Sequence, residues 1–345
     1  MNSQANVETR PAPAVAPDKR LFGQRFRPFV RFTRRRLLHA VIVLFIVSGF
    51  TTLLVDMVPG DPATVLLGEN ATPQSVALAR ERLGLNKPLI DRYFEWAGNA
   101  VRGDLGTSLR TNERVTDAIK QRLPVTLQLT VLAQLFALAM CLPLAMVMAT
   151  RAGRKVDRIA ESVLSVIIAT PSFVLGVGLI YFVGIKWNLL PILGWTPLTE
   201  DLVENLRRAA LPAFTIALLE MAAYTRLLRG DLITTFQDDY ILAARSKGLS
   251  SRRVLFGHAL RPSSFTLVTY SALSFARLLG GTVIVESMFT LPGLGRLAVD
   301  AVKYGDLVMV QGIAIFIAVV YLVINLLVDV AYGWLDPRAR EGGAK

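Results

Sequence analysis

Hydrophobic residues along this chain gather in six blocks of about twenty positions, and polar segments separate the blocks. A helical block of this length crosses the hydrocarbon core of a bilayer, whereas a soluble domain would show amphipathic stripes. The pattern therefore predicts an all-α integral membrane protein with six transmembrane helices. The expected spans run roughly over Leu37–Val58, Pro124–Thr150, Ala160–Ile185, Ala209–Leu228, Ser263–Val285 and Val310–Trp334.

The composition supports a membrane protein and excludes a soluble enzyme. Hydrophobic residues make up 53% of the 345 positions and charged residues only 19%, whereas soluble domains carry about 25% charged residues. The mean hydropathy is +0.47. The single cysteine, Cys141, lies inside an apolar block and has no partner for an intrachain disulfide.

Positive charge lies on alternate connections between the blocks. The net charge is +12. No nucleic-acid-binding motif accompanies it, so we attribute it to the positive-inside rule of membrane proteins. The N-terminal arm, residues 1–36, is basic. From Lys19 to Arg36 it carries eight Lys and Arg and no acidic residue. Arg20 to Arg35 either forms a helix on the inner leaflet or serves only as a topology signal. The connections at 151–158 and 229–261 and the C-terminal tail are also basic, which predicts that both termini are cytoplasmic.

The outer connection, residues 59–123, is too long for a bare linker. Thr72 with Pro73 begins one helical piece and Gly84 ends it, a second piece starts at Pro88, and a third covers Glu113–Leu123. A turn-forming stretch, residues 103–108, lies between the second and third pieces. This loop either receives an external partner or caps a cavity, or it is a folded spacer.

The residues required for common hydrolytic and metal chemistry are missing from the sequence. The two histidines, His39 and His258, are far apart and lack a neighbouring cysteine or carboxylate set, so no zinc site is expected. The sequence contains no Gly-x-Ser-x-Gly elbow and no Gly-Lys pair, so neither a serine hydrolase nor a phosphate loop is expected. We therefore expect a non-catalytic chain that binds no cofactor and no metal itself.

The most informative segment is the inner loop, residues 231–262. Tyr240, Ala243, Ala244 and Lys247 recur at helical spacing and are expected on one face of a short helix. Small alanines on that face would let another protein approach closely, with the tyrosine as an aromatic anchor. Gly248 is expected to end this helix in a left-handed conformation. Ser250 is then expected to cap a second helix, which carries Arg252, Arg253 and His258.

The inner loop resembles the EAA loop of permease subunits of ABC importers, in the dipeptide, oligopeptide and nickel branch. Ala243, Ala244 and Gly248 match the spacing of that motif, whereas Leu242 stands where the family usually has an acid. Stretches at 59–62, 103–108, 170–173, 280–286 and 292–296 look like the same branch. The resemblance implies that an ATPase-coupling surface is formed by Asp239, Tyr240, Ala243, Ala244, Arg245, Lys247, Gly248, His258 and Arg261.

The resemblance also implies a type I ABC importer permease fold, with residues 124–345 as the core that holds spans two to six. Its implied partners are a second six-span permease, one or two ABC ATPase subunits that bind ATP and Mg²⁺, an extracytoplasmic solute-binding protein and the lipid bilayer. The implied location is the cytoplasmic membrane of a bacterium or archaeon. The implied cargo is a di- or oligopeptide; the alternatives are a nickel chelate, glutathione or another small solute. An ATP-independent channel or scaffold is the remaining class.

Three charged residues lie inside or at the end of the expected spans: Glu220, Arg277 and Glu286. A charge in a bilayer costs several kcal/mol, roughly 3 on insertion scales, unless it is paired or faces water. These residues therefore either line the translocation pathway or, in the case of Arg277 and Glu220, pair and hold the bundle together. Pro143, Pro171 and Pro212 permit bends, and Gly280 with Gly281 permits close helix packing.

Overall fold

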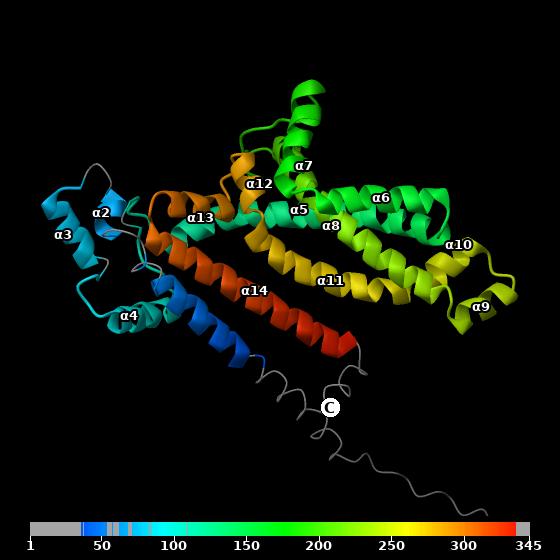
Figure 1. The fold of residues 1–345 in the computed structure, drawn as a ribbon, viewed down its shortest axis with the longest axis horizontal. Coiled ribbons are helices and arrows are strands. Elements are labelled where there is room, and N and C mark those ends of the chain that lie inside the picture. Colours follow the sequence, from blue (N-terminus) through cyan, green and yellow to red (C-terminus); the bar gives the residue numbers. More distant parts are fainter. Residues whose placement is uncertain are drawn as a thin grey trace, which may run out of the picture.

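The structure is a computed structural model that describes residues 36, 38–53, 57, 62–67, 71–82, 84–108 and 110–335. Within these residues the regular elements are helices (Figure 1). One isolated antiparallel bridge joins Thr107 and Arg114. After the helix Leu38–Leu53 come α2 (Pro62–Leu67), α3 (Pro73–Arg82), α4 (Leu89–Val101), α5 (Val115–Thr150), α6 (Lys155–Ala169), α7 (Ser172–Leu179), the π-helix η2 (Ile180–Lys186), α8 (Leu202–Thr235), α9 (Asp239–Ser246), α10 (Ser251–Val254), the π-helix η3 (Leu255–Ala259), α11 (Leu260–Gly281), α12 (Val283–Met288), α13 (Leu294–Lys303) and α14 (Leu307–Leu335).

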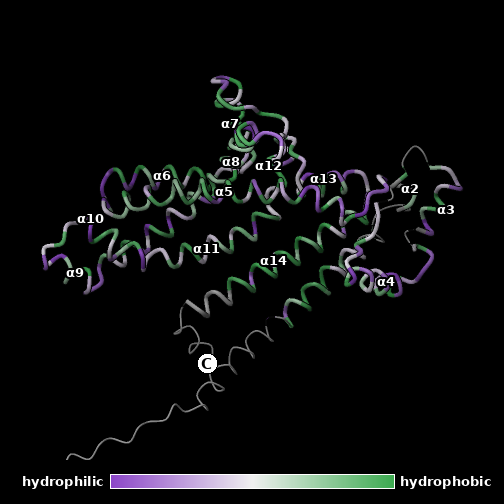
Figure 2. The backbone as a smooth tube through the Cα atoms, turned by 180° about the vertical axis from the view of Figure 1, so that it is seen from behind, coloured by the Kyte–Doolittle hydropathy of each residue, from purple (hydrophilic) through white to green (hydrophobic). Residues whose placement is uncertain are grey.

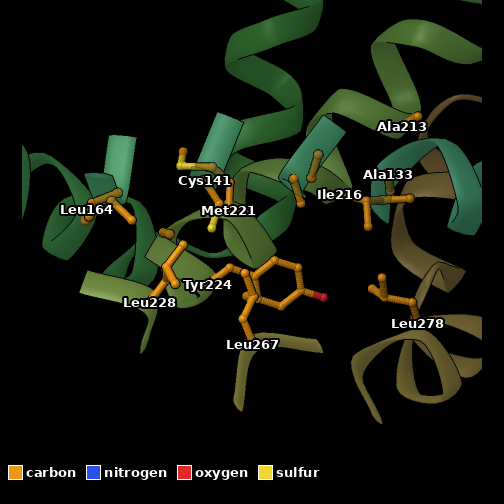
Figure 3. Packing of buried hydrophobic residues seen from close by; sticks show 14 of the residues in the cluster. Ala133, Cys141, Leu164, Ala213, Ile216, Met221, Tyr224, Leu228, Leu267 and Leu278 are labelled. Atoms are coloured by element: carbon orange, nitrogen blue, oxygen red, sulfur yellow. The ribbon is translucent and has the colours of Figure 1, made fainter. Parts of the chain in front are cut away.

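The core of the bundle forms where α5 packs along α8. On α5, fully buried small residues recur every fourth position. Three fully buried alanines of α8 follow the same spacing, and both sets belong to one hydrophobic cluster (Figure 3). Small side chains on matching faces let two membrane helices approach closely, which increases their van der Waals contact. The residues concerned are Ala133, Ala137, Cys141 and Ala145 on α5 and Ala209, Ala213 and Ala217 on α8.

Fewer spans are evident in the described structure than the six expected. By length and composition, α5, α8 and α14 can cross a membrane, and α6 with the helix that follows it makes a fourth candidate. The helix Leu38–Leu53 is apolar but shorter. Hydrophobic residues predominate along α14, and polar residues gather at α3, α4, α9 and α10 (Figure 2). The chain is therefore a multi-helix membrane protein. The basic arm, apart from Arg36, and residues 336–345 lie outside the described residues.

The third expected span is not one straight helix. It divides at Thr170 and Pro171 into α6 and the α7–η2 helix, which are bent by 106° relative to each other (Figure 1). Proline lacks the N–H that would continue the helical ladder, and it disfavours a helical conformation at the preceding residue. Pro143 and Pro212, by contrast, lie inside the continuous helices α5 and α8.

The third piece expected in the outer connection is the first part of α5, which runs unbroken from Val115 through Pro124. The helix α3 occupies the range expected for the first piece. The helix α4 begins where the second piece is expected, directly after Pro88, but it continues past the expected end at Trp96 to Val101. Tyr93 of α4 hydrogen-bonds Ser48 at 2.9 Å, and Gln311 of α14 donates to Thr52 at 2.8 Å. These contacts attach α4 and α14 to the helix Leu38–Leu53.

The turn at 103–108 is packed on the chain itself. Ser108 donates to a carboxylate oxygen of Asp306 at 2.5 Å, and both residues are buried. A Cβ at Gly106 would lie 2.8 Å from the Val308 side chain, so the close approach to α14 needs a glycine there. This part of the connection is therefore folded against the start of α14.

Candidate functional site

The short helix of the inner loop, α9, ends as its sequence predicts. Gly248 has a φ of +78°, a conformation that glycine adopts without the penalty of a Cβ. Its N–H donates to the Arg245 carbonyl, and the N–H of Leu249 donates to the Ala244 carbonyl at 3.3 Å. These two bonds form a Schellman motif. The chain therefore reverses sharply just after Lys247.

The sequence predicts that one face of α9 presents four residues to a partner: Tyr240, Ala243, Ala244 and Lys247. The structure differs for Ala244. Ala244 is buried together with Ile241 in the main hydrophobic cluster, whereas Tyr240, Ala243 and Lys247 are exposed. Ala244 is therefore small because it packs inside the protein. The exposed surface of α9 is formed around Tyr240, Ala243 and Lys247.

Charged and aromatic contacts stabilise the same region. The Arg245 guanidinium lies 5.5 Å from the centre of the Phe236 ring, just after α8, which is within cation–π range. Partial burial and the nearby Asp238 carboxylate raise the pKa of Tyr240 above its usual value, so its hydroxyl stays neutral at physiological pH. Asp239, the first residue of α9, is exposed.

The second helix of the loop is continuous with the fifth expected span. The Ser250 hydroxyl caps α10 by accepting from the Arg253 N–H at 3.4 Å, as expected. The chain then passes through η3 into α11 with helical backbone angles at both junctions. Ser263 donates to Thr235 at 2.9 Å and joins the start of α11 to the end of α8. The exposed basic residues of this stretch are Arg252, Arg253, His258 and Arg261.

Glu220 of α8 and Arg277 of α11 form an ion pair. Nη2 of Arg277 lies 2.8 Å from one carboxylate oxygen and 3.1 Å from the other, and 3.3 Å from the Ser274 hydroxyl. Beside them, Tyr224 hydrogen-bonds Gln134 of α5. The structure shows the pairing of Arg277 with Glu220 within the bundle, and 58% of the Arg277 side chain stays exposed beside this pair.

Glu286 holds a loop together. Its carboxylate is fully buried and accepts hydrogen bonds from Thr126 and Thr282 at 2.7 Å and from the Arg296 N–H at 3.1 Å. A Cβ at Gly293 or Gly295 would lie less than 3 Å from this carboxylate. The Pro-Gly-Leu-Gly-Arg stretch at 292–296 therefore wraps around a buried acid that is hydrogen-bonded within the protein.

A second buried ion pair was not anticipated from the sequence. Asp157 of α6, only 3% exposed, accepts two hydrogen bonds from Arg229 of α8 at 2.6 and 2.7 Å. Its carboxylate also accepts from the Gly153 N–H at 2.8 Å. In the sequence, Asp157 and Arg229 appear only as members of two basic connections. The one feature that could have indicated the ion pair is that Asp157 is the single acidic residue in the basic stretch 151–158.

No group of three or more metal-ligand side chains occurs among the residues that the structure describes. The site consists of exposed helical surface and ion pairs. An exposed helix–turn segment is joined to α11, and a charged pair lies further along the same helix. Such an arrangement can transmit a displacement from a partner at one end of α11 to polar groups within the bundle.

Two family models match the sequence of this chain. The family described as "Binding-protein-dependent transport system inner membrane component" matches residues 141–341. The N-terminal family of the same membrane components matches residues 29–130. A crystal structure described as an amino acid ABC transporter with histidines is similar over 62% of this chain and 92% of its own, with 22% identity and a TM-score of 0.49.

Curated relatives match along almost the whole length. A probable peptide ABC transporter permease of Sinorhizobium fredii is 37% identical over 89% of this chain and 98% of its own length. A putative peptide transport system permease of Brucella abortus is 35% identical over the same shares. A glutathione transport system permease of Escherichia coli is 34% identical over 90% of this chain and 99% of its own. The chain therefore belongs to the family of inner membrane components of binding-protein-dependent transport systems.

Proposed function

We propose that this chain is the membrane-spanning permease subunit of an ATP-driven importer that takes up di- or oligopeptides delivered by an extracytoplasmic binding protein. The observation that carries the substrate class is the 35–37% identity, over about nine-tenths of the chain, to permeases named for peptide transport. Glutathione is the second candidate, because a permease named for glutathione is 34% identical over a similar length. Nickel chelates and other small solutes are further alternatives.

In this proposal the coupling segment, residues 239–248, docks onto an ATPase subunit that binds ATP and Mg²⁺. Three features support it: α9 exposes Tyr240, Ala243 and Lys247, the chain reverses at Gly248, and α10 continues into α11. Closure of the ATPases would move α9, and the continuous helix would carry that movement to α11. The chain itself performs no chemistry in this scheme.

We further propose six spans with both termini in the cytoplasm of a bacterial or archaeal cell, and a second permease that completes the pathway. The distribution of Lys and Arg supports this orientation, because the inner loop and the 151–158 connection then lie on the same side as the basic arm. The apolar helix Leu38–Leu53 and α11 would supply the two spans beyond the four candidates.

The test is mass spectrometry of the proteins that co-purify with the tagged chain from its own membranes in mild detergent. The proposal expects one or two ATPases and a second six-span permease. Recovery of the chain alone, or as a homo-oligomer without an ATPase in several detergents, would instead favour a channel or scaffold.

The cargo is tested with the complete transporter in proteoliposomes that are supplied with its binding protein. ATP-dependent uptake of a radiolabelled dipeptide, of glutathione and of a nickel chelate is compared under identical conditions. Peptide uptake that exceeds the other two supports the proposal. Uptake of the nickel chelate alone would refute the substrate class and leave the importer assignment intact.

A further inference from the structure

Arg277 presents an exposed charge on a helix that is expected to lie in the membrane. Its side chain is 58% exposed, whereas its partner Glu220 is only 8% exposed. The position falls within the fifth expected span, residues 263–285. An arginine that faced lipid there would cost several kcal/mol, because acyl chains provide no hydrogen-bond acceptors. The exposed side of Arg277 therefore faces water or a polar partner.

The neighbouring positions on α11 strengthen this conclusion. Residues at helical spacing from Arg277 form a stripe that mixes polar, small and apolar side chains: Thr266, Tyr270, Leu273, Arg277 and Gly281, of which all but the partly buried Tyr270 are exposed. The exposed positions of the helix Leu38–Leu53 after His39 are, by contrast, entirely apolar: Val41, Ile42, Val43, Phe45, Ile46, Phe50 and Leu53. A lipid-facing surface is uniformly apolar. The exposed face of the helix Leu38–Leu53 has this property, and the stripe on α11 does not.

The ion pair orients the guanidinium through a single nitrogen. Both contacts to the glutamate and the contact to Ser274 go through Nη2. The N–H groups of Nε and Nη1 donate to neither residue, and a guanidinium N–H is a strong hydrogen-bond donor to a carboxylate oxygen. Because Glu220 is almost buried, it holds the arginine in place without offering its own charge to a ligand on the exposed side.

We propose that Arg277 is a specificity-determining residue that binds the carboxylate of the transported solute as the solute passes along α11. The inference rests on the proposed importer function and names the ligand chemistry at one position of the pathway. Glu220 is a positioning residue in this scheme. A peptide with a free C-terminal carboxylate fits the site, and the same peptide with an amidated C-terminus lacks the group that Arg277 recognises.

The first test compares ATP-dependent uptake of radiolabelled dialanine and dialanine amide by the complete transporter. The same binding protein serves every permease variant, so its own preference cancels when variants are compared. Arg277→Gln should reduce uptake of the free acid about tenfold or more, the usual effect of losing a charged hydrogen bond, and reduce uptake of the amide much less. An equal loss of both would show a purely structural role and overturn the proposal, as would no loss of either.

Arg277→Gln leaves Glu220 buried without its partner, so a second variant keeps the test decisive. Glu220→Gln with Arg277→Gln replaces the ion pair by two amides that can hydrogen-bond each other. This double variant should remain assembled and still lack the preference for the free acid. If it retains the preference, the assignment of Arg277 is wrong. If the unmodified transporter moves neither peptide, the proposed function fails instead.

The second test needs no transport. Leu273→Cys is placed one turn from Arg277 in a Cys141→Ala background, and Val43→Cys on the helix Leu38–Leu53 is the control with the same 41% exposure. In the complete transporter, with reagent on both sides of the membrane, Leu273→Cys should react faster with an anionic than with a cationic methanethiosulfonate. Adding Arg277→Gln should abolish that difference, and Val43→Cys should react with neither. An unreactive Leu273→Cys variant, or no effect of Arg277→Gln, would overturn the proposal.

Discussion

The Thr126 hydroxyl donates a hydrogen bond of 2.7 Å to the Glu286 carboxylate and thereby joins α5 to α12 across 160 positions of the chain. The same hydroxyl accepts from the Leu294 N–H at 2.9 Å. One threonine and one buried acid thus fix the loop that leads from α12 into α13. Because the carboxylate is satisfied by this chain's own donors, the acid stabilises the loop.

The glycines around Glu286 lead to a stability prediction. In Gly295→Ala, the new Cβ would lie 2.6 Å from the Val283 Cα and 2.9 Å from a Glu286 oxygen. Overpacking of this kind costs about 1–3 kcal/mol, so the thermal unfolding temperature of the detergent-solubilised protein should fall. Gly281→Ala is the control, because its Cβ would meet no atom within 4 Å. Equal unfolding temperatures for the two variants would contradict the described packing.

The Asp157–Arg229 pair predicts a second destabilising substitution. Arg229→Ala would leave a buried carboxylate without its charged partner. Breaking such a pair costs about 3–5 kcal/mol, and we expect the lower end because the arginine side chain is 26% exposed. Arg207→Ala is the control, because Arg207 is 59% exposed and lies 3.9 Å from Glu204; exposed pairs contribute about 0–1 kcal/mol. Unfolding midpoints measured by intrinsic fluorescence would distinguish the two variants.

The two alanines of the inner loop should respond differently to the same substitution. Ala243→Trp adds a bulky group on an exposed surface, so the protein should fold and insert normally but lose ATPase stimulation and transport. Ala244→Trp places the same bulk in the hydrophobic cluster and should lower the unfolding temperature. Both variants are assayed for thermal stability and, in the reconstituted transporter, for ATPase rate. Normal transport by Ala243→Trp would refute the proposed coupling surface.

The reversal at Gly248 provides an independent test of the same segment. Any L-residue at a φ of +78° is strained, at a cost of about 1–2 kcal/mol, so Gly248→Ala should change the orientation of the α9 end and reduce coupled ATPase activity. Gly230→Ala in α8 is the matched control, because no atom lies near its Cβ and alanine favours a helix interior. We expect that control to retain full activity.

The outer connection yields a prediction about local order. Ser108→Ala removes the donor to Asp306 and the acceptor for the Arg110 and Thr111 N–H groups. Losing a buried, charged hydrogen bond costs about 1.5–3 kcal/mol, so limited proteolysis should cleave more quickly near residues 103–114. Ser75→Ala, at the exposed start of α3, is the control. Unchanged cleavage would show that the turn is held by its apolar contacts alone.

Local signals in the sequence account for several elements of this fold. The end of α9 at Gly248, the cap of α10 by Ser250 and the break of the third span at Pro171 all follow from the backbone chemistry of single residues. The apolar blocks indicate the membrane class because hydrophobicity over about twenty residues is itself a local quantity. The bend angle at Pro171 and the uninterrupted passage of α5 through Pro124 depend on neighbouring helices, and a proline alone does not determine either.

The partners of the charged residues were decided only by the tertiary structure. Glu220, Arg277 and Glu286 are equally visible in the sequence as charges in or near apolar segments. One acid pairs with the arginine across two helices, and the other is enclosed by hydroxyl and backbone donors from distant segments. Likewise, Ala243 and Ala244 are adjacent and identical, yet only one is exposed. Sequence spacing determined that each residue lies on a helix, whereas burial depends on which other helices pack against that face.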